Sequence, residues 1–290
     1  MHVFLTGATG YLGAAVAGAL RGAGHEVSGL ARSPDAAEKL RSVGVRPVPG
    51  GLHDLPALAE AARAADGVIH AANTNDAEAG SADAAAVSAM LLALAGSGKP
   101  FVYTSGVWVY GDTGGAVVDE KTSLKPAPIA AWRPAVEEAV LGSVARGVRA
   151  IVIRPGLVYG RGGGIPAMLV RSARESGTAR FVGDGRNHWP VVDLDDLAAL
   201  YVLALERAPA GTVLVAVTES QPVADIARAA SEGVGAGGRT TAWPLAEARQ
   251  SLGPLADALA LDQRASGARA RTLGWQPRAA GILETLRSGQ

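Results

Sequence analysis

The sequence has no cysteine among its 290 residues, which excludes disulfide bonds, thiolate catalysis and zinc–sulfur sites. Histidine is also scarce, and the five histidines lie far apart in the chain: His2, His25, His53, His70 and His188. None of them pairs with another at the short spacing that a histidine metal site needs. We therefore predict that the protein binds no metal.

The chain has no surplus of charge, since Lys plus Arg and Asp plus Glu each number 27. Proteins that bind nucleic acid or membrane surfaces by charge carry a basic surplus, and the few aromatic residues also argue against base stacking. No apolar run approaches the roughly 18 residues of a membrane span, and the first residues lack a secretory signal pattern. We expect a soluble, cytoplasmic protein with neither nucleic acid nor membrane as a partner.

The first half of the sequence alternates short apolar runs with longer helical patterns. The runs that indicate strands are residues 3–6, 26–30, 45–48, 67–70, 101–104 and 148–153. The stretches that indicate helices are residues 11–23, 34–42, 54–65, 82–96 and 135–146. This order predicts an α/β fold with a doubly wound parallel sheet and helices on both faces.

Beyond about residue 154 the alternation weakens. Residues 160–164 are nearly all glycine and predict a loop. Helices are expected near 166–175 and 195–207, a strand near 212–217, and a helical pattern broken by Gly and Pro from 221 onward. We interpret this part as a smaller C-terminal lobe interleaved with the end of the sheet.

Three glycines, Gly7, Gly10 and Gly13, recur directly after the first expected strand in the stretch VFLTGATGYLGAAV. At that place Gly7 permits a tight turn, Gly10 lets a pyrophosphate approach the backbone, and Gly13 lets the helix pack on the strand. The helix N-terminus beyond them attracts phosphate. The stretch predicts a dinucleotide-binding turn, and the alternative is an ordinary glycine-rich turn in a chain with 38 glycines.

The run from Thr6 to Gly13 reads T-G-x-x-G-x-x-G and resembles the short-chain dehydrogenase/reductase superfamily in its extended or atypical, NAD-dependent epimerase/dehydratase-like branch. The likeness continues in order through VIHAAN (68–73), FVYTSGVWVYG (101–111), RPGLVYG (154–160) and VVDLDDL (191–197). It covers about the first 200 residues. It implies a Rossmann fold with a dinucleotide-binding core at residues 1–155 and a mostly substrate-binding lobe at residues 156–290.

The second expected strand bears on the choice of nicotinamide cofactor. NAD sites usually place a carboxylate after this strand, on the ribose 2′-hydroxyl. Here Arg32 and Ser33 follow instead, and a guanidinium can pair with a 2′-phosphate. We predict NADP(H), with Arg32 and Ser33 on the phosphate; the alternative is a solvated surface arginine.

The resemblance also implies which other residues lie along the cofactor: Gly7, Thr9, Gly10, Tyr11, Leu12, Leu52, Ala71, Ala72, Asn73, Thr104, Ser105, Arg133, Pro155, Gly156 and Val158. His70 is interpreted as a packed strand residue.

Members of this superfamily usually carry a catalytic Ser or Thr and a Tyr-x-x-x-Lys. Alignment places Gly106 in the first position, Ile129 in the Tyr position and Arg133 in the Lys position. No Tyr-x-x-x-Lys occurs anywhere in the chain, and an arginine donates no proton at neutral pH. Because Pro134 fits only the first turn of a helix, we expect Arg133 at a helix entrance.

The candidate catalytic residues are therefore Arg133, Ser105, Tyr110, Tyr159 and His188. Each of the last four also has a structural interpretation, as a cavity wall, a strand end or a surface loop. We expect residues 154–160, 160–164 and 183–189 to border the substrate pocket, with Trp189 either in its wall or in the core.

The sequence predicts an NADP(H)-dependent oxidoreductase acting on a carbonyl or enone of a small organic molecule. The missing Tyr and Lys leave two alternatives open: a non-redox cyclase, isomerase or dehydratase, and a non-catalytic NADP(H)-binding regulator. The family often dimerises through two helices, and a homodimer stays open as well.

Overall fold

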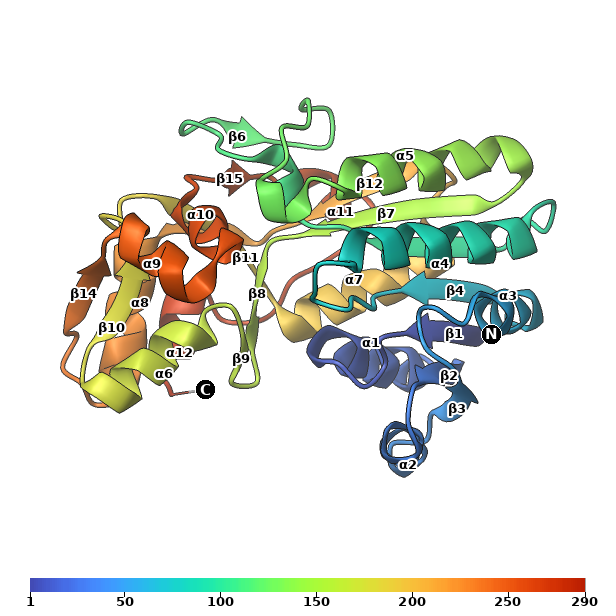
Figure 1. The fold of residues 1–290 in the computed structure, drawn as a ribbon, viewed down its shortest axis with the longest axis horizontal. Helices are drawn as coiled ribbons and strands as arrows, with labels where there is room; N and C mark the ends of the chain where they lie inside the picture. Colours follow the sequence, from blue (N-terminus) through green and yellow to red (C-terminus); the bar gives the residue numbers. More distant parts are fainter. Residues whose placement is uncertain (290) are drawn as a thin grey trace.

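The apolar runs of the first half form the centre of a seven-stranded sheet. In the computed structural model, which describes residues 1–289, this sheet lies on the right of Figure 1 and a second lobe lies on the left. Its strands are β1 (His2–Thr6), β2 (Glu26–Ala31), β3 (Arg46–Pro49), β4 (Gly67–His70), β5 (Pro100–Thr104), β7 (Arg149–Pro155) and β12 (Thr212–Ala216). All pairs are parallel in the order β12-β7-β5-β4-β1-β2-β3, which confirms the predicted doubly wound sheet.

Alternate residues of β1 explain why helices cover both faces. Val3 and Leu5 belong to a core that includes α1 (Tyr11–Gly22), α2 (Pro34–Ser42) and α7 (Leu194–Arg207). Phe4 belongs to the opposite core, with α3 (Leu55–Ala64), α4 (Ala79–Leu94) and α5 (Arg133–Gly142). None of the helices within residues 1–289 has both the length and the apolar character that crossing a bilayer requires.

The second lobe is built on a four-stranded sheet that continues from β7. Its order is β13-β11-β8-β9, formed by β8 (Leu157–Gly160), β9 (Gly163–Gly164), β11 (His188–Asp193) and β13 (Glu219–Pro222). A parallel pair, β10 (Ala179–Val182) with β14 (Thr240–Trp243), lies beyond it. The helices of this lobe are α6 (Ala167–Ser176), α8 (Val223–Gly233), α9 (Leu245–Leu252), α10 (Pro254–Ala260) and α12 (Ile282–Arg287).

The remaining elements are short. They are the single-turn helices η1 (Val107–Tyr110), η2 (Pro128–Ala130) and η3 (Ser143–Arg146), the paired strands β6 (Val117–Val118) and β15 (Arg264–Ala265), and α11 (Ala268–Thr272).

Two expectations for the second half are wrong in part. The glycine run expected to be only a loop contains β9, which pairs with Tyr159 and Gly160. The stretch from 221 onward, expected to be helical, also contains the strands β14 and β15. The pairing of β14 with β10, about 60 residues earlier in the chain, has no local signal in the sequence. Strand β12 comes from the second half of the chain and joins the main sheet, and α7 from the same half packs on that sheet.

Candidate functional site

The turn between β1 and α1 tolerates no side chain at two of its glycines. Gly7 has φ +75°, in the left-handed region, and a Cβ there would lie 2.8 Å from the Ala71 carbonyl oxygen. A Cβ at Gly13 would lie 2.0 Å from the Gly7 carbonyl oxygen, so α1 packs on the turn only because residue 13 is glycine. The Gly10 amide closes the turn by donating to the Gly7 carbonyl at 2.9 Å.

The start of α1 is open to a ligand. Gly10 is exposed, and a Cβ there would meet only the Gly7 carbonyl oxygen, at 3.2 Å. Among the described residues no side chain caps the first turn of α1, and this turn contains no acidic residue. Uncapped N–H groups and the positive end of the helix dipole attract phosphate. The residues of this turn thus fit the pyrophosphate of a dinucleotide.

A cavity of about 1070 Å³ lies beside this turn, lined by residues that follow β4, β5 and β7. Its wall contains predicted cofactor residues from separate segments: Tyr11, Leu12, Asn73, Thr104, Ser105, Arg133, Pro155, Gly156 and Val158. The other predicted cofactor residues lie outside this wall, in or beside the glycine turn (Gly7, Thr9, Gly10, Ala71, Ala72) and after β2 and β3 (Arg32, Ser33, Leu52). The cavity stands where parallel α/β sheets bind ligands, at the carboxyl ends of the strands.

Arg32 and Ser33 lie at the end of β2, as the sequence predicts. Arg32 is exposed, and none of the ion pairs within residues 1–289 involves it. The Ser33 hydroxyl accepts from the Ala36 amide at 3.2 Å and so caps α2, which begins with Pro34. The hydroxyl proton of Ser33 stays available to a phosphate oxygen.

Tyr11 connects the glycine turn with the second lobe. Its hydroxyl donates to the Gly160 carbonyl at 2.6 Å, and its ring packs so closely on β9 that a Cβ at Gly163 would lie 2.3 Å from a ring carbon. Burial, and then the nearby Asp193 carboxylate, raise the pKa of the Tyr11 phenol. Tyr11 is therefore a neutral hydrogen-bond donor that holds one wall of the cavity.

Arg133 is the first residue of α5, which confirms the expected helix entrance. Its Nη1 donates to the Thr104 carbonyl at 2.7 Å and lies 3.4 Å from the Tyr103 hydroxyl. The guanidinium carbon lies 4.4 Å from the centre of the Trp132 ring, a cation–π contact. These contacts fix a half-buried positive charge in the cavity wall, and within residues 1–289 no carboxylate pairs with it.

A buried polar chain connects Arg133 with the glycine turn. The Tyr103 hydroxyl donates to Asp83 Oδ2 at 2.7 Å, and His70 Nε2 lies 2.9 Å from Asp83 Oδ1. His70 Nδ1 lies 2.8 Å from the Thr6 hydroxyl, which accepts from the Ala71 amide at 3.2 Å. Burial, and then the Asp83 carboxylate, raise the pKa of Tyr103, so its hydroxyl keeps its proton.

Of the residues that join Arg133 to the glycine turn through these hydrogen bonds, only His70 was singled out from the sequence, as a packed strand residue. Asp83 is the one charged residue of α4, in the run SADAAAVSAM, and its 3% exposure shows that it points into the core. The available signal was a single carboxylate among alanines on a helix. A carboxylate that is buried there needs hydrogen-bond partners, so it indicates a buried polar network.

Two further wall positions bear on the chemistry. Ser105 is 6% exposed, and its hydroxyl has no hydrogen-bond partner within residues 1–289. Gly106 and Ile129 also line the cavity, so a hydrogen atom and an alkyl group stand at the positions where the resemblance implies a hydroxyl and a phenol. Ile129 belongs to η2 and Arg133 to α5, so the two do not share a helix face.

Tyr110 lies outside the cavity wall, in a buried ion-pair cluster. Its hydroxyl accepts from Arg154 Nη1 at 2.7 Å, and Arg154 Nε lies 3.1 Å from Glu137 Oε1. Burial raises the pKa of Tyr110 to about 12, although Arg154 opposes the shift. The structure therefore does not bring Tyr110 to the cavity with the other candidates, and its hydroxyl instead fixes Arg154 in the core.

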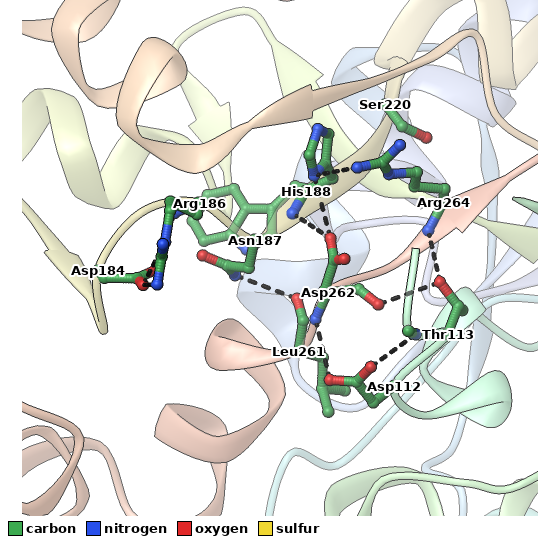
Figure 2. Close-up of polar contacts among 12 residues, drawn as sticks. Asp112, Thr113, Asp184, Arg186, Asn187, His188, Ser220, Leu261, Asp262 and Arg264 are labelled. Carbon is green, nitrogen blue, oxygen red and sulfur yellow. Dashed lines mark hydrogen bonds and ion pairs between the residues drawn. The ribbon is translucent and has the colours of Figure 1, made fainter. Parts of the chain in front are cut away.

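Tyr159 and His188 also lie outside the cavity wall. The Tyr159 hydroxyl donates to the Ala280 carbonyl at 2.9 Å, and burial raises its pKa. His188 lies in the polar cluster of Figure 2, where its Nδ1 is 3.0 Å from Asp262 Oδ1 and 3.2 Å from an Arg264 nitrogen. The structure therefore does not bring these two candidates to the cavity, since each side chain is engaged elsewhere.

Of the segments expected to border the pocket, residues 183–189 do not line the cavity. Trp189 is buried, and its indole nitrogen donates to the Leu259 carbonyl at 3.0 Å, so it belongs to the core. The wall on this side comes instead from α9 and α10, through Leu252, Pro254 and Leu255.

Comparison with known proteins agrees with this geometry. Residues 3–216 match the NAD dependent epimerase/dehydratase family. The chain belongs to this family. A family relationship was predicted from the T-G-x-x-G-x-x-G turn and the ordered segments after it, and it is confirmed.

Two relatives and one solved structure illustrate the likeness. An uncharacterized protein of Schizosaccharomyces pombe is 35% identical over 301 residues, covering 99% of each chain. The 4-hydroxy-2-methyl-3-oxo-4-farnesyl-3,4-dihydroquinoline-1-oxide ketoreductase of Stigmatella aurantiaca is 29% identical over 233 residues, covering 77% of this chain and 70% of that one. The dTDP-glucose 4,6-dehydratase of Bacillus anthracis in complex with NAD superposes with a TM-score of 0.82 at 15% identity, over 99% of this chain and 96% of that one.

Proposed function

We propose that the protein is an NADP(H)-dependent oxidoreductase that reduces a carbonyl or enone of a small organic molecule in the cavity described above. The observation that carries the proposal is the uncapped start of α1, with Gly10 open to a pyrophosphate, directly beside a cavity that holds one fixed cation. The ketoreductase relative and the NAD complex of the structural neighbour support it.

The nicotinamide would supply a hydride, and the chain's own residues would bind and orient. Arg133 is held by the Thr104 carbonyl and the Trp132 ring, so its remaining N–H groups can stabilise negative charge that develops on a substrate oxygen. Arg133 donates no proton at neutral pH, and Ile129 has none to give. Reduction of a conjugated double bond suits such a wall, because water can protonate the resulting enolate at carbon.

The preference for NADP(H) rests on Arg32. Its exposed guanidinium at the end of β2 is available to a 2′-phosphate, and the Ser33 hydroxyl beside it can donate a second hydrogen bond.

A second function is supported by one observation. The alkyl group of Ile129 stands where the resemblance implies a catalytic phenol, which favours a non-redox cyclase, isomerase or dehydratase, or a non-catalytic NADP(H)-binding regulator. Product formation without consumption of NADPH would identify the non-redox enzyme, and binding of NADPH without any turnover would identify the regulator.

The test is a fluorescence titration of wild type, Arg32→Ala and Arg41→Ala with NADPH and NADH. Arg41 is an exposed arginine on α2 that pairs with Glu38, so it controls for loss of surface charge. We expect Arg32→Ala to weaken NADPH binding about tenfold and NADH binding little, and Arg41→Ala to change neither. Equal losses for both cofactors would contradict the NADP(H) assignment, and a wild type that binds neither would contradict the proposed function.

A further inference from the structure

The substrate part of the cavity is poor in charge. The charged residues of its wall are Arg133 and Asp76. Arg133 already donates to the Thr104 carbonyl, and Asp76 Oδ1 accepts from the Thr74 hydroxyl at 2.8 Å and from the Glu78 amide at 2.9 Å. A diphosphate that does not lie on a helix N-terminus needs Arg or Lys side chains as partners. This wall offers a single cation, which lies beside the predicted cofactor residues.

The same wall is rich in apolar side chains. They come from separate elements that close around the cavity: Trp108, Ile129, Trp132, Ile165, Leu252 and Leu255. Ile129 is 36% exposed, so an apolar surface is open to solvent there. Apolar walls with a few convergent polar groups are typical of sites for apolar small molecules.

One buried polar side-chain atom in this wall has no hydrogen-bond partner within residues 1–289. The Ser105 hydroxyl is buried at the end of β5, in the segment that also carries the Thr104 carbonyl on which Arg133 is fixed. A buried hydroxyl without a hydrogen bond is costly, and a carbonyl oxygen of a ligand is a suitable acceptor.

From these three observations we infer that the cavity takes an apolar, phosphate-free carbonyl compound rather than a nucleotide sugar. Its hydrocarbon part lies between Trp108, Ile129 and Leu255, and its carbonyl oxygen accepts from Ser105 beside Arg133. The inference rests on the proposed function for the identity of the cofactor site. It differs from the nucleotide-sugar chemistry named for the dehydratase with the same fold.

The experiment measures ligand affinity through the fluorescence of the tryptophans in the wall, with NADP⁺ present. The ligands are methyl ketones and their α,β-unsaturated counterparts, lengthened by two carbons at a time, and UDP-glucose. We expect affinity to rise about fourfold for each added CH₂ that is buried, with no binding of UDP-glucose at the same concentrations. Tighter binding of UDP-glucose than of the longest ketone, or affinity that is independent of chain length, would overturn the inference.

Two variants test the position of the ligand. Ile129→Arg places a cation in the apolar wall. We expect it to lower the affinity for the longest ketone about tenfold, while the affinity for NADPH stays within about twofold of that of the wild type. Leu92→Arg is the matched control, because Leu92 is an exposed apolar residue of α4 outside the cavity, and it should change neither affinity. Equal effects of both variants would overturn the placement.

The NADPH titration of the wild type distinguishes failure of the inferred substrate class from failure of the proposed function. If NADPH binds but the ketones do not, the substrate class is wrong and the cofactor site stands. If NADPH itself does not bind, the proposed function fails.

Discussion

At the scale of single residues, the glycine turn yields the sharpest prediction. Replacing Gly13 by alanine puts a Cβ 2.0 Å from the Gly7 carbonyl oxygen, so either the turn or α1 must move. We expect Gly13→Ala to lower the free energy of unfolding by about 1–3 kcal/mol and to weaken NADPH binding. Urea unfolding followed by circular dichroism, together with the NADPH titration, measures both effects.

Gly18 on the same helix provides the control. A Cβ there meets no atom within 4 Å, and alanine is a better helix former than glycine. Gly18→Ala should therefore raise the free energy of unfolding by about 0.5–1 kcal/mol and leave NADPH binding unchanged. If the two variants behaved alike, close packing of α1 on the turn would not be the reason for Gly13.

The residues of the site form two groups. Some have their structural partners within a few residues in the sequence, and others have them far away. The glycine turn, Arg32 and the entrance position of Arg133 follow from neighbours within a few residues, and the sequence predicted where each would lie. Tyr110 and Tyr159 looked like candidate acids because a phenol carries the same chemistry everywhere. Their roles depend on Arg154 and on the Ala280 carbonyl, which are 44 and 121 residues away.

At the scale of elements, the main sheet and its helices can be predicted from hydrophobic periodicity and from helix-capping residues. The second lobe cannot be predicted in this way. Buried parallel strands of the main sheet are recognisable as short apolar runs, and Ser33 and Asp54 cap the helices that follow β2 and β3. The strands of the lobe are two to six residues long and partly exposed, and β10 pairs with β14 across 61 residues. Nothing local in either segment indicates such a partner.

The segment between α10 and β15 shows how such distant elements are held together. Asp262 Oδ1 accepts from the His188 amide at 2.8 Å and lies beside its ring, while the Asp262 amide donates to Asp112 Oδ2 at 3.3 Å (Figure 2). The Asp262 carbonyl accepts from the Thr113 amide at 2.9 Å. This one residue thus connects β11 with the loop that follows η1.

Asp262→Ala removes the carboxylate and leaves the His188 amide and ring without that acceptor. We expect the free energy of unfolding to fall by about 1–3 kcal/mol. Asp184→Ala is the matched control within the same view, because the pair of Asp184 with Arg186 is exposed and local, and it should change stability by no more than about 0.5 kcal/mol (Figure 2). Urea unfolding measures both, and a silent Asp262→Ala would refute the connecting role.

At the scale of the whole molecule, the boundary predicted at residue 155 stays a prediction, but the chain crosses it repeatedly. Tyr201 on α7 is fully buried against the sheet and donates to the Thr104 hydroxyl at 2.7 Å. In the opposite direction, Val109, Tyr110 and Val118 come from before residue 155 and are buried in the core of the lobe. Neither the sheet nor the lobe therefore completes its own core from one continuous stretch.

This interleaving predicts a single cooperative unfolding transition for the intact chain, because loss of the lobe removes the cover of the sheet. NADPH that binds the glycine turn must then stabilise both parts together. At a free concentration of one hundred times its Kd, it should raise the free energy of unfolding by about 2.7 kcal/mol, whichever part is observed. Tryptophan fluorescence reports on the lobe through Trp189, on the cavity through Trp108 and on the core of the sheet through Trp275. Far-ultraviolet circular dichroism reports on the whole backbone, so the two urea curves should coincide with and without NADPH. Two separated transitions, of which NADPH shifts only one, would instead mean that the sheet and the lobe are independent folding units. In that case β12 and α7, which come from the second half of the chain, would not couple the two parts.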